Sequence, residues 1–231
     1  MQQINVVISG FDHYDGIDVN PAVEVPRVLA EQGLGAASDG TYDDPLAGVQ
    51  VNVRAVALPV SFANAWPALR DVIDTTHPDI VIATGLKHTA RGILLERCAT
   101  NLMDAARPDA DNATPRREAI NPNGPAAYWT RLPLRSILKD FARDGVPAAL
   151  SSDAGTFVCN SLFYNLLNWT ATQDQVLGGF VSLPRVAARG FDHGVARRGL
   201  PLDRQVAAVR DVVREAVRYR RSPSSGDILI D

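Results

Sequence analysis

The sequence predicts an α/β fold with three layers, in which an open, twisted, mainly parallel sheet is covered by helices on both faces. Short apolar runs rich in β-branched residues alternate along the chain with stretches in which apolar residues recur at helical spacing. This alternation is typical of strands joined by crossover helices. The chain has 231 residues, of which 46% are apolar and 21% charged, so it is long enough to form one sizeable core.

The amino-terminal half begins with a strand, a turn and a helix. Residues 4–9 are an apolar β-branched run, and residues 10–19, which follow, are rich in Gly and Asp. Pro21 then opens a helix over residues 21–32, at a position where its missing N–H costs no hydrogen bond. Residues 33–48 are small and polar without periodicity, which predicts a surface loop. The alternation continues with a strand at 49–59, a helix at 62–75 and a buried strand at 80–84.

The carboxyl-terminal half repeats the alternation after an irregular segment. Residues 93–100 are a further predicted strand, whereas residues 107–125 are too polar and Pro-rich for a helix or a strand. Helices are predicted at 135–143, 157–169 and 202–219, and strands at 148–151 and 179–183. The last helix packs on the sheet through Leu202, Val206, Val209, Val213 and Val217. We expect residues 1–219 to form a single domain and residues 220–231 to be a flexible tail.

Composition and charge exclude several classes of protein. The net charge of −3 favours neither a nucleic-acid nor a membrane partner, and no apolar run approaches the roughly 20 residues of a membrane span. The amino terminus lacks a basic segment followed by an apolar stretch, so we expect a cytoplasmic protein. Cys98 and Cys159 are too few for a disulfide framework and lack the spacing of a zinc site. We therefore expect no metal and no cofactor, and any cysteine chemistry to be thiol chemistry.

Cys159 lies in the sharpest candidate site, the segment 151–160, where a strand runs through a turn of small residues into a helix. Ligands of open parallel sheets bind beyond the carboxyl ends of the strands. If Thr156 is the N-cap, Cys159 lies in the first helical turn, where free N–H groups and the helix dipole favour a thiolate and could receive an oxyanion. The alternative is that Cys159 is a small core residue beneath the helix face of Phe163 and Leu166.

Glu96 lies inside the apolar stretch of residues 93–99, where a carboxylate must be paired or have a function. One interpretation is a salt bridge to a nearby arginine. The other is the acidic member of a Cys-His-acid set, which orients an imidazole. The residues alone leave both interpretations open.

These residues belong to a resemblance that spans nearly the whole chain. The sequence is similar to pyroglutamyl peptidase I, the cysteine peptidases of family C15, which remove an N-terminal pyroglutamyl residue from peptides. The matching stretches are Ser9-Gly10-Phe11-Asp12, Asn20-Pro21, Leu58-Pro59-Val60, Leu95-Glu96-Arg97-Cys98-Ala99, Gly124-Pro125-Ala126-Ala127-Tyr128 and Ala154-Gly155-Thr156-Phe157-Val158-Cys159-Asn160. The last of these is the family's nucleophile signature.

The resemblance implies roles for particular residues. Cys159 matches the nucleophile and Glu96 the acidic member of the triad. Phe11, Tyr14 and Asn20 match residues that line the pocket for the lactam ring, a group that needs apolar walls and a few polar partners. The resemblance also implies a phosphorylase/hydrolase-like fold and a peptide or small lactam or amide substrate, and it leaves a homodimer or homotetramer open.

The sequence departs from the family at three active-site positions. Ser182 stands where the family has the triad histidine, and a hydroxyl cannot act as a general base near neutral pH. The family's Gly- and Arg-containing loop is replaced by residues 85–91. An arginine that helps hold the oxyanion is displaced by one residue, with Ala106 in its position and Arg107 next to it.

Histidines elsewhere are the candidates for a replacement base. His88 follows the strand 80–84 on a loop that leads to Glu96, and His193 lies eleven residues beyond Ser182. Either could point an imidazole at the nucleophile, because a triad is defined by geometry and not by sequence order. A site without any replacement base is the third outcome. Two further histidines are weaker candidates: His13 in the first turn, and His77 at a helix end away from the expected site.

Three functions follow from these observations. The first is a cysteine hydrolase of the pyroglutamyl peptidase type, impaired because the family histidine is Ser182. The second is a non-catalytic relative that binds a small lactam, an amide or a peptide N-terminus. The third is a cysteine hydrolase of altered specificity, because residues 86–88 change the pocket. We expect Cys159 to be alkylated faster than Cys98, and Glu96, Ser182 and Cys159 to cluster at one end of the sheet.

Overall fold

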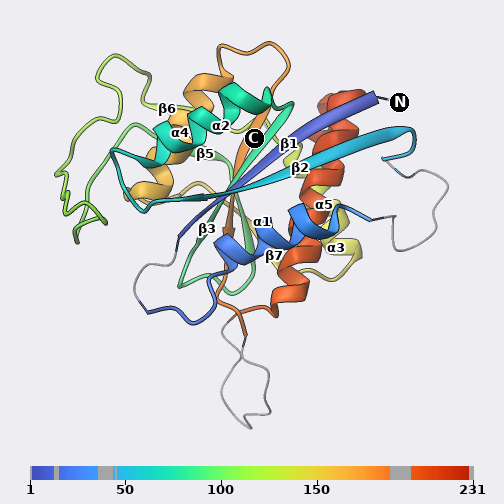
Figure 1. Cartoon of the computed structure of the whole chain (residues 1–231), viewed down its shortest axis with the longest axis horizontal. Helices are drawn as coiled ribbons and strands as arrows, with labels where there is room; N and C mark the ends of the chain where they lie inside the picture. The colour runs from blue at the N-terminus through green and yellow to red at the C-terminus, as the bar shows by residue number, and fades with distance from the viewer. Residues whose placement is uncertain (1, 13–15, 36–43, 45, 188–198, 229–231) are drawn as a thin grey trace, which may run out of the picture.

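The central sheet of the computed structural model has six strands in the order β2-β1-β3-β8-β4-β7. Figure 1 shows β1 and β2 running side by side at one edge of this sheet. The structure describes residues 2–12, 16–35, 44, 46–187 and 199–228. The strands of this sheet are β1 (Gln2–Phe11), β2 (Val49–Leu58), β3 (Ile80–Leu86), β4 (Ile93–Glu96), β7 (Ala148–Ser151) and β8 (Leu177–Leu183). A second sheet pairs β5 (Cys98–Thr100) with β6 (Ala127–Trp129).

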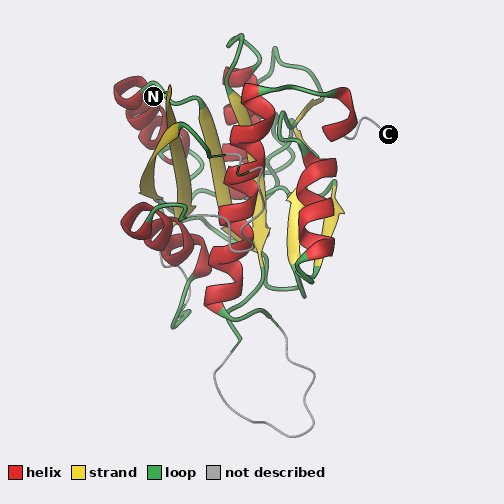
Figure 2. Cartoon of the chain, turned by 90° about the vertical axis from the view of Figure 1, so that its right-hand side faces the viewer, coloured by secondary structure: helices red, strands yellow, loops and turns green. Residues whose placement is uncertain are grey.

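Helices cover both faces of the sheet, so that the molecule has three layers, as Figure 2 shows. One face carries α1 (Pro21–Gln32), α3 (Leu134–Arg143) and α5 (Leu202–Arg221); the other carries α2 (Ala65–Thr76) and α4 (Val158–Thr170). Each face has its own apolar cluster, because alternate residues of the strands point to opposite sides. The predicted α/β class with a mainly parallel sheet is confirmed.

Two of the six strands run against the others. Strands β2, β1, β3 and β8 are mutually parallel, whereas β4 is antiparallel to β8 and β7 is parallel to β4. Only residues 87–92 separate β3 from β4. This link is shorter than the dozen or more residues that a parallel crossover needs, so the chain turns back. The reversal brings Glu96 to the middle of β8, opposite Phe180.

Several element boundaries differ from the sequence expectation. The predicted strand 93–100 is two strands, because Arg97 leaves the sheet: β4 pairs within the large sheet and β5 pairs with β6. The strand β6 was not expected. The final helix reaches Arg221, two residues beyond its predicted end, and a short 3₁₀ helix follows at Ser225–Asp227. There Arg218 forms an ion pair with Asp227.

Membrane and metal features are absent from the described part of the chain. None of its helices is both long enough and apolar enough to cross a membrane. The described residues also contain no group of three or more His, Cys, Asp or Glu side chains placed to hold a metal ion.

The contact between α3 and α5 predicts a pH-dependent stability. Burial and the neighbouring Glu215 raise the pKa of Asp140 to about 7, against the opposing effect of Arg143. A carboxyl whose pKa is higher in the folded state stabilises the fold at low pH, and this contribution is lost as the pH rises toward 7. Asp140→Asn should therefore stabilise the protein at pH 8 by about 1 kcal/mol after solvent screening, and by less at pH 5.

Urea unfolding of both proteins at pH 5 and pH 8 measures this difference. Part of the pH dependence of the free energy of unfolding remains in the variant, because burial and Asp144 raise the pKa of Asp211 to about 6. An Asp140→Asn variant that gains no more at pH 8 than at pH 5 would contradict the prediction.

Candidate active site

A cavity of about 280 Å³ opens at the carboxyl ends of β1, β3 and β8. Its walls come from the turn after β1, the turn after β3 and the turn that leads into α4. Cys159 and Ser182 both line it. Ligands of open α/β sheets bind at this edge, so the cavity lies where the fold class predicts a site.

Cys159 is the second residue of α4, whose N-cap is Phe157. The expectation that Thr156 caps this helix is wrong, because its hydroxyl donates instead to the carbonyl of Asp104 at 2.6 Å. The thiol occupies space that Gly85 leaves open. A Cβ at that position would lie 3.0 Å from the Cys159 Sγ and 2.7 Å from the ring of Phe180.

The thiol of Cys159 is less acidic than its place in the helix predicts. Burial, followed by the charge of Glu96, raises its pKa to about 12. Lys87 and Arg107 act in the opposite direction with smaller effect. The backbone N–H of Cys159 at the start of the helix does lower this pKa, but burial and Glu96 outweigh it, so the net lowering that we expected is not found. Burial and the negative charge of Glu96 destabilise the Cys159 thiolate by more than Lys87 and Arg107 stabilise it.

Glu96 and Ser182 form a buried pair. The Ser182 hydroxyl donates to Glu96 Oε1 at 2.6 Å, and both residues are at most 5% exposed. Their side chains share a face because β4 and β8 pair Glu96 with Phe180 and Leu94 with Ser182. Among the described residues, no group forms a hydrogen bond with Glu96 Oε2, and no arginine forms an ion pair with this carboxylate. The salt-bridge interpretation of Glu96 therefore finds no support in the described part of the chain.

Two cations, Lys87 and Arg107, border the cavity. From the sequence, both belong only to departures from the family pattern. The Lys87 ammonium donates to the carbonyl of Asp153, in the turn before α4. The Arg107 guanidinium lies over the ring of Phe157, 5.3 Å from its centroid. Arg107 reaches the site although it is one residue from the matched position. It belongs to a segment without helix or strand, where a shift of one residue does not turn a side chain to the opposite face.

A comparison with protein families settles the relationship of this chain. The family model of pyroglutamyl peptidase matches residues 4–219. The chain belongs to the pyroglutamyl peptidase family. It is 37% identical over 215 residues to the pyrrolidone-carboxylate peptidase of Bacillus subtilis, with 93% of each chain covered. The pyrrolidone-carboxylate peptidase of Pseudomonas fluorescens is 36% identical over 208 residues, with 90% of each covered.

Solved structures of pyroglutamyl peptidases have the same fold. The pyroglutamyl peptidase I of Bacillus amyloliquefaciens has a TM-score of 0.78 at 31% identity, covering 94% of this chain and 98% of that one. The pyrrolidone carboxyl peptidase of Thermococcus litoralis has a TM-score of 0.81 at 27% identity, with 99% of both chains covered. The likeness in fold therefore covers nearly the whole chain.

Of the three residues that the resemblance implies for a lactam pocket, the structure describes two. Phe11 and Asn20 line the cavity, whereas Tyr14 lies outside the described residues. The amide of Asn20 is engaged within the protein. Its Nδ2 donates to the carbonyl of Phe11 at 2.9 Å, and its Oδ1 accepts from the N–H of Ala22 at 3.1 Å, which caps α1. Asn20 therefore shapes the first turn of the pocket.

The two histidines that the structure describes lie at opposite ends of the sheet. His88 lines the cavity, and burial, together with Arg185, lowers its pKa, so more of the imidazole is neutral near pH 7. A neutral imidazole is the form that accepts a proton. His77 ends α2 just before β3 begins, on the side opposite the cavity. His13 and His193 lie outside the described residues.

The pKa of Cys159 predicts slow alkylation at neutral pH. With a pKa of about 12, roughly one thiol in 10⁵ is ionised at pH 7, against about one in 10² for an ordinary cysteine. Iodoacetamide should therefore modify Cys159 about 10²- to 10³-fold more slowly than it modifies cysteine in solution. The rate should rise nearly tenfold per pH unit up to about pH 11.

Mass spectrometry after timed labelling at several pH values measures this rate for each cysteine. Cys98 serves as the internal comparison, because it is buried and burial also raises its pKa. We still expect it to react more slowly than Cys159, which lines a cavity. A rate at Cys159 that is already constant below pH 8 would show a thiolate stabilised by the helix N-terminus and its neighbouring cations.

Proposed function

We propose that this chain is a cysteine hydrolase of the pyroglutamyl peptidase type whose turnover is low, because Ser182 stands where the family has a histidine. The observation that carries the proposal is the cavity in which Cys159, at the start of α4, lies beside the pair of Glu96 and Ser182. A nucleophile, an acidic residue and the position between them are present together. Within this set, the imidazole is the group that is replaced, by the hydroxyl of Ser182.

The first chemical step is attack of the Cys159 sulfur on the carbonyl carbon of the pyroglutamyl residue. The thiol proton passes to a base, and the carbonyl oxygen becomes an oxyanion. Backbone N–H groups of the first turn of α4, with Lys87 and Arg107 on the cavity wall, are the groups that can stabilise this charge. Collapse of the intermediate breaks the amide bond, gives a thioester and releases a peptide whose new amino terminus takes the proton.

The second step is hydrolysis of the thioester. Water gives a proton to the base and attacks the same carbonyl carbon, which releases pyroglutamate and restores the thiol. A pyroglutamyl ring is small, and a cavity of about 280 Å³ is near the lower end of the range for ligand pockets. Phe11, Val60 and Phe157 supply apolar walls for the ring.

The general base is the component of this mechanism that position 182 does not supply. Without an imidazole between them, the carboxylate of Glu96 opposes ionisation of Cys159. His88 is the candidate for a relocated base, because it lines the same cavity and its pKa is lowered. It would take the thiol proton in place of the family histidine, while Ser182 keeps its hydrogen bond to Glu96 Oε1. His193 is the second candidate, on its place in the sequence.

Two alternatives rest on specific features. A non-catalytic lactam-binding or peptide-binding protein is favoured by Ser182 and by the raised pKa of Cys159. A hydrolase of altered specificity is favoured by Leu86, Lys87 and His88, all of which line the cavity.

Hydrolysis of a pyroglutamyl aminocoumarin substrate tests the proposal. The natural chain should release coumarin slowly, and Cys159→Ala should release none, which separates turnover from a contaminating peptidase. His88→Ala and His193→Ala identify a relocated base by loss of the remaining rate. Release that persists in Cys159→Ala refutes the proposed nucleophile. A natural chain that binds pyroglutamate by calorimetry and releases no coumarin refutes the enzyme and supports the binding protein.

A further inference from the structure

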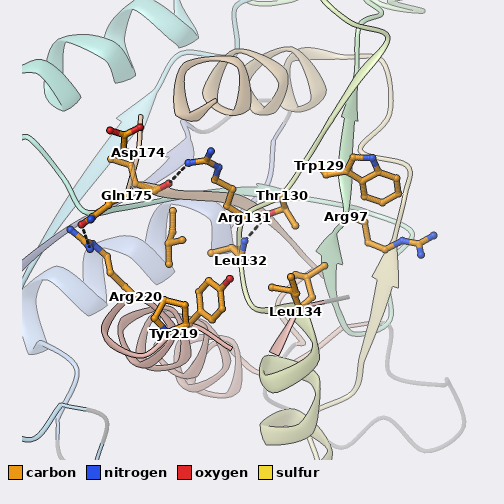
Figure 3. A pocket seen from close by; sticks show the side chains of 14 residues that line it. Arg97, Trp129, Thr130, Arg131, Leu132, Leu134, Asp174, Gln175, Tyr219 and Arg220 are labelled. Atoms are coloured by element: carbon orange, nitrogen blue, oxygen red, sulfur yellow. Dashed lines mark hydrogen bonds between the residues drawn. The ribbon is translucent and has the colours of Figure 1, made fainter. Parts of the chain in front are cut away.

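A second cavity, of about 750 Å³, lies at the other end of β8 (Figure 3). Leu177, the first residue of β8, lines this cavity, whereas Ser182 near the end of the strand lines the candidate active site. The two cavities share no lining residue among those described. The volume is within the range of pockets for small molecules, so the second cavity is a separate potential site.

The cavity has an apolar floor and an exposed indole at its rim. Leu132, Leu134 and Leu177 are almost fully buried beneath it, and Tyr219 of α5 adds an aromatic ring. Figure 3 shows Trp129 on one side, Asp174 and Gln175 on the other, and Leu132 and Tyr219 between them. Trp129 is 60% exposed. An indole left in water beside an apolar cavity is typical of a surface that binds an apolar group.

Arg131 supplies a positive charge to the same cavity. Its Nη1 donates to the carbonyl oxygens of Gln173 at 2.7 Å and Val176 at 3.5 Å. These neutral partners fix the guanidinium but do not cancel its charge, and no described carboxylate forms an ion pair with it. Arg220, on the same wall, differs because Asp79 pairs with it. Asp174 also lines the cavity, beyond ion-pair distance from Arg131.

We propose that this cavity binds a small monocarboxylate with an apolar or aromatic body. The carboxylate binds the remaining N–H groups of Arg131, in the planar geometry that suits a guanidinium. The body lies on Leu132 and Tyr219, with Trp129 covering its edge. A single charge is favoured over a phosphate dianion, because Asp174 on the same wall repels further negative charge.

Hydrocinnamate and its neutral amide, hydrocinnamide, are the two probes of the test. Both have the same apolar body, and only the acid carries the charge. Isothermal titration is carried out on the Cys159→Ala protein, so that the result does not depend on turnover at the other site. We expect the acid to bind about tenfold more tightly than the amide. Asp174→Asn should strengthen binding of the acid and leave the amide unchanged.

Variants of the two walls separate the contributions of charge and apolar contact. Arg131→Gln should remove the preference for the acid, and Arg131→Lys should keep part of it. Because Arg131 also holds two backbone carbonyls, Trp129→Ala at an exposed position is the second variant. Trp129→Ala should weaken the binding of the acid and of the amide equally. Thermal unfolding without ligand shows that each variant is folded.

Three results would overturn the proposal. The first is equal affinity for acid and amide, or no binding of either up to about 10 mM. The second is binding that survives Arg131→Gln and Trp129→Ala but is lost on Phe11→Ala, which would place the probe in the candidate active site. The third is a stable dimer in which the fluorescence of Trp129, measured as the sole tryptophan after Trp66→Phe and Trp169→Phe, is shielded from acrylamide. That result would assign this face to contact between two copies.

Discussion

Replacing Ser182 with histidine should raise kcat/KM for a pyroglutamyl aminocoumarin by about 10²- to 10⁴-fold, the usual contribution of a general base. Position 182 points from β8 into the cavity, on the face where Glu96 already accepts a hydrogen bond. An imidazole there can keep the bond to Glu96 with one nitrogen and accept the Cys159 proton with the other. The same change should speed alkylation of Cys159 at pH 7, because a nearby imidazolium stabilises the thiolate.

Two matched variants show whether the gain comes from the imidazole. Ser182→Ala removes the hydroxyl without adding a base, so its kcat/KM should not rise. Glu96→Gln in the Ser182→His background should remove most of the gain, because the amide no longer favours the required tautomer. A folded Ser182→His protein that hydrolyses no faster than the natural chain refutes the impaired triad. High activity in the natural chain, abolished by His88→Ala, would show instead that the base has moved.

Replacing Gly10 with alanine should cost about 3 kcal/mol or more in the free energy of unfolding, at the upper end of overpacking effects. A Cβ at this position would lie 1.4 Å from the carbonyl oxygen of Ala22 and 3.1 Å from the hydroxyl of Thr84. Both neighbours are fixed, because Thr84 donates to the carbonyls of Ser9 and Ala22. The start of α1 must therefore move away from β1, which also displaces Asn20 and the wall of the active-site cavity.

Urea unfolding of Gly10→Ala beside Gly226→Ala measures the cost. Gly226 is the control, because the nearest atom to a Cβ there is 3.5 Å away, an ordinary contact. We expect the control to change the free energy of unfolding by less than about 0.5 kcal/mol. A Gly10→Ala protein as stable as this control would show that α1 can shift freely on the sheet. If Gly10→Ala yields no folded protein, the substitution costs more than the whole free energy of unfolding of the natural chain, which agrees with the prediction.

Local sequence patterns are enough to predict most of the helices and strands. The helix at residues 21–32 and the strand at 148–151 were predicted with the bounds that the structure has, because Pro21 and the apolar run report short-range preferences of the chain. The strand at 93–100 was predicted as one element because both halves are apolar. Only pairing with two different partners divides it at Arg97.

The membership of the candidate site also came largely from the sequence. Cys159, Glu96 and Ser182 lie in motifs that can be matched position by position, and the fold brings them together. We expected the three residues to meet because the carboxyl ends of parallel strands lie at one edge of a sheet. This reason does not hold for all three. Ser182 lies near the carboxyl end of a parallel strand, whereas Glu96 arrives on an antiparallel strand that the sequence pattern did not distinguish. Strand direction depends on how short a link must close, not on the residues of the strand itself.

The sequence by itself determined the α/β class and the family, and it predicts that Ser182 replaces a base, because these depend on residue identity and order. The tertiary structure alone decided the electrostatics of the site. The thiol of Cys159 is placed by its helix where an anion is favoured, yet enclosure and the charge of Glu96 raise its pKa to about 12. Lys87 and Arg107 become neighbours of Cys159 only through folding. Charge interactions and desolvation depend on distance and burial in three dimensions, which no spacing along the chain encodes.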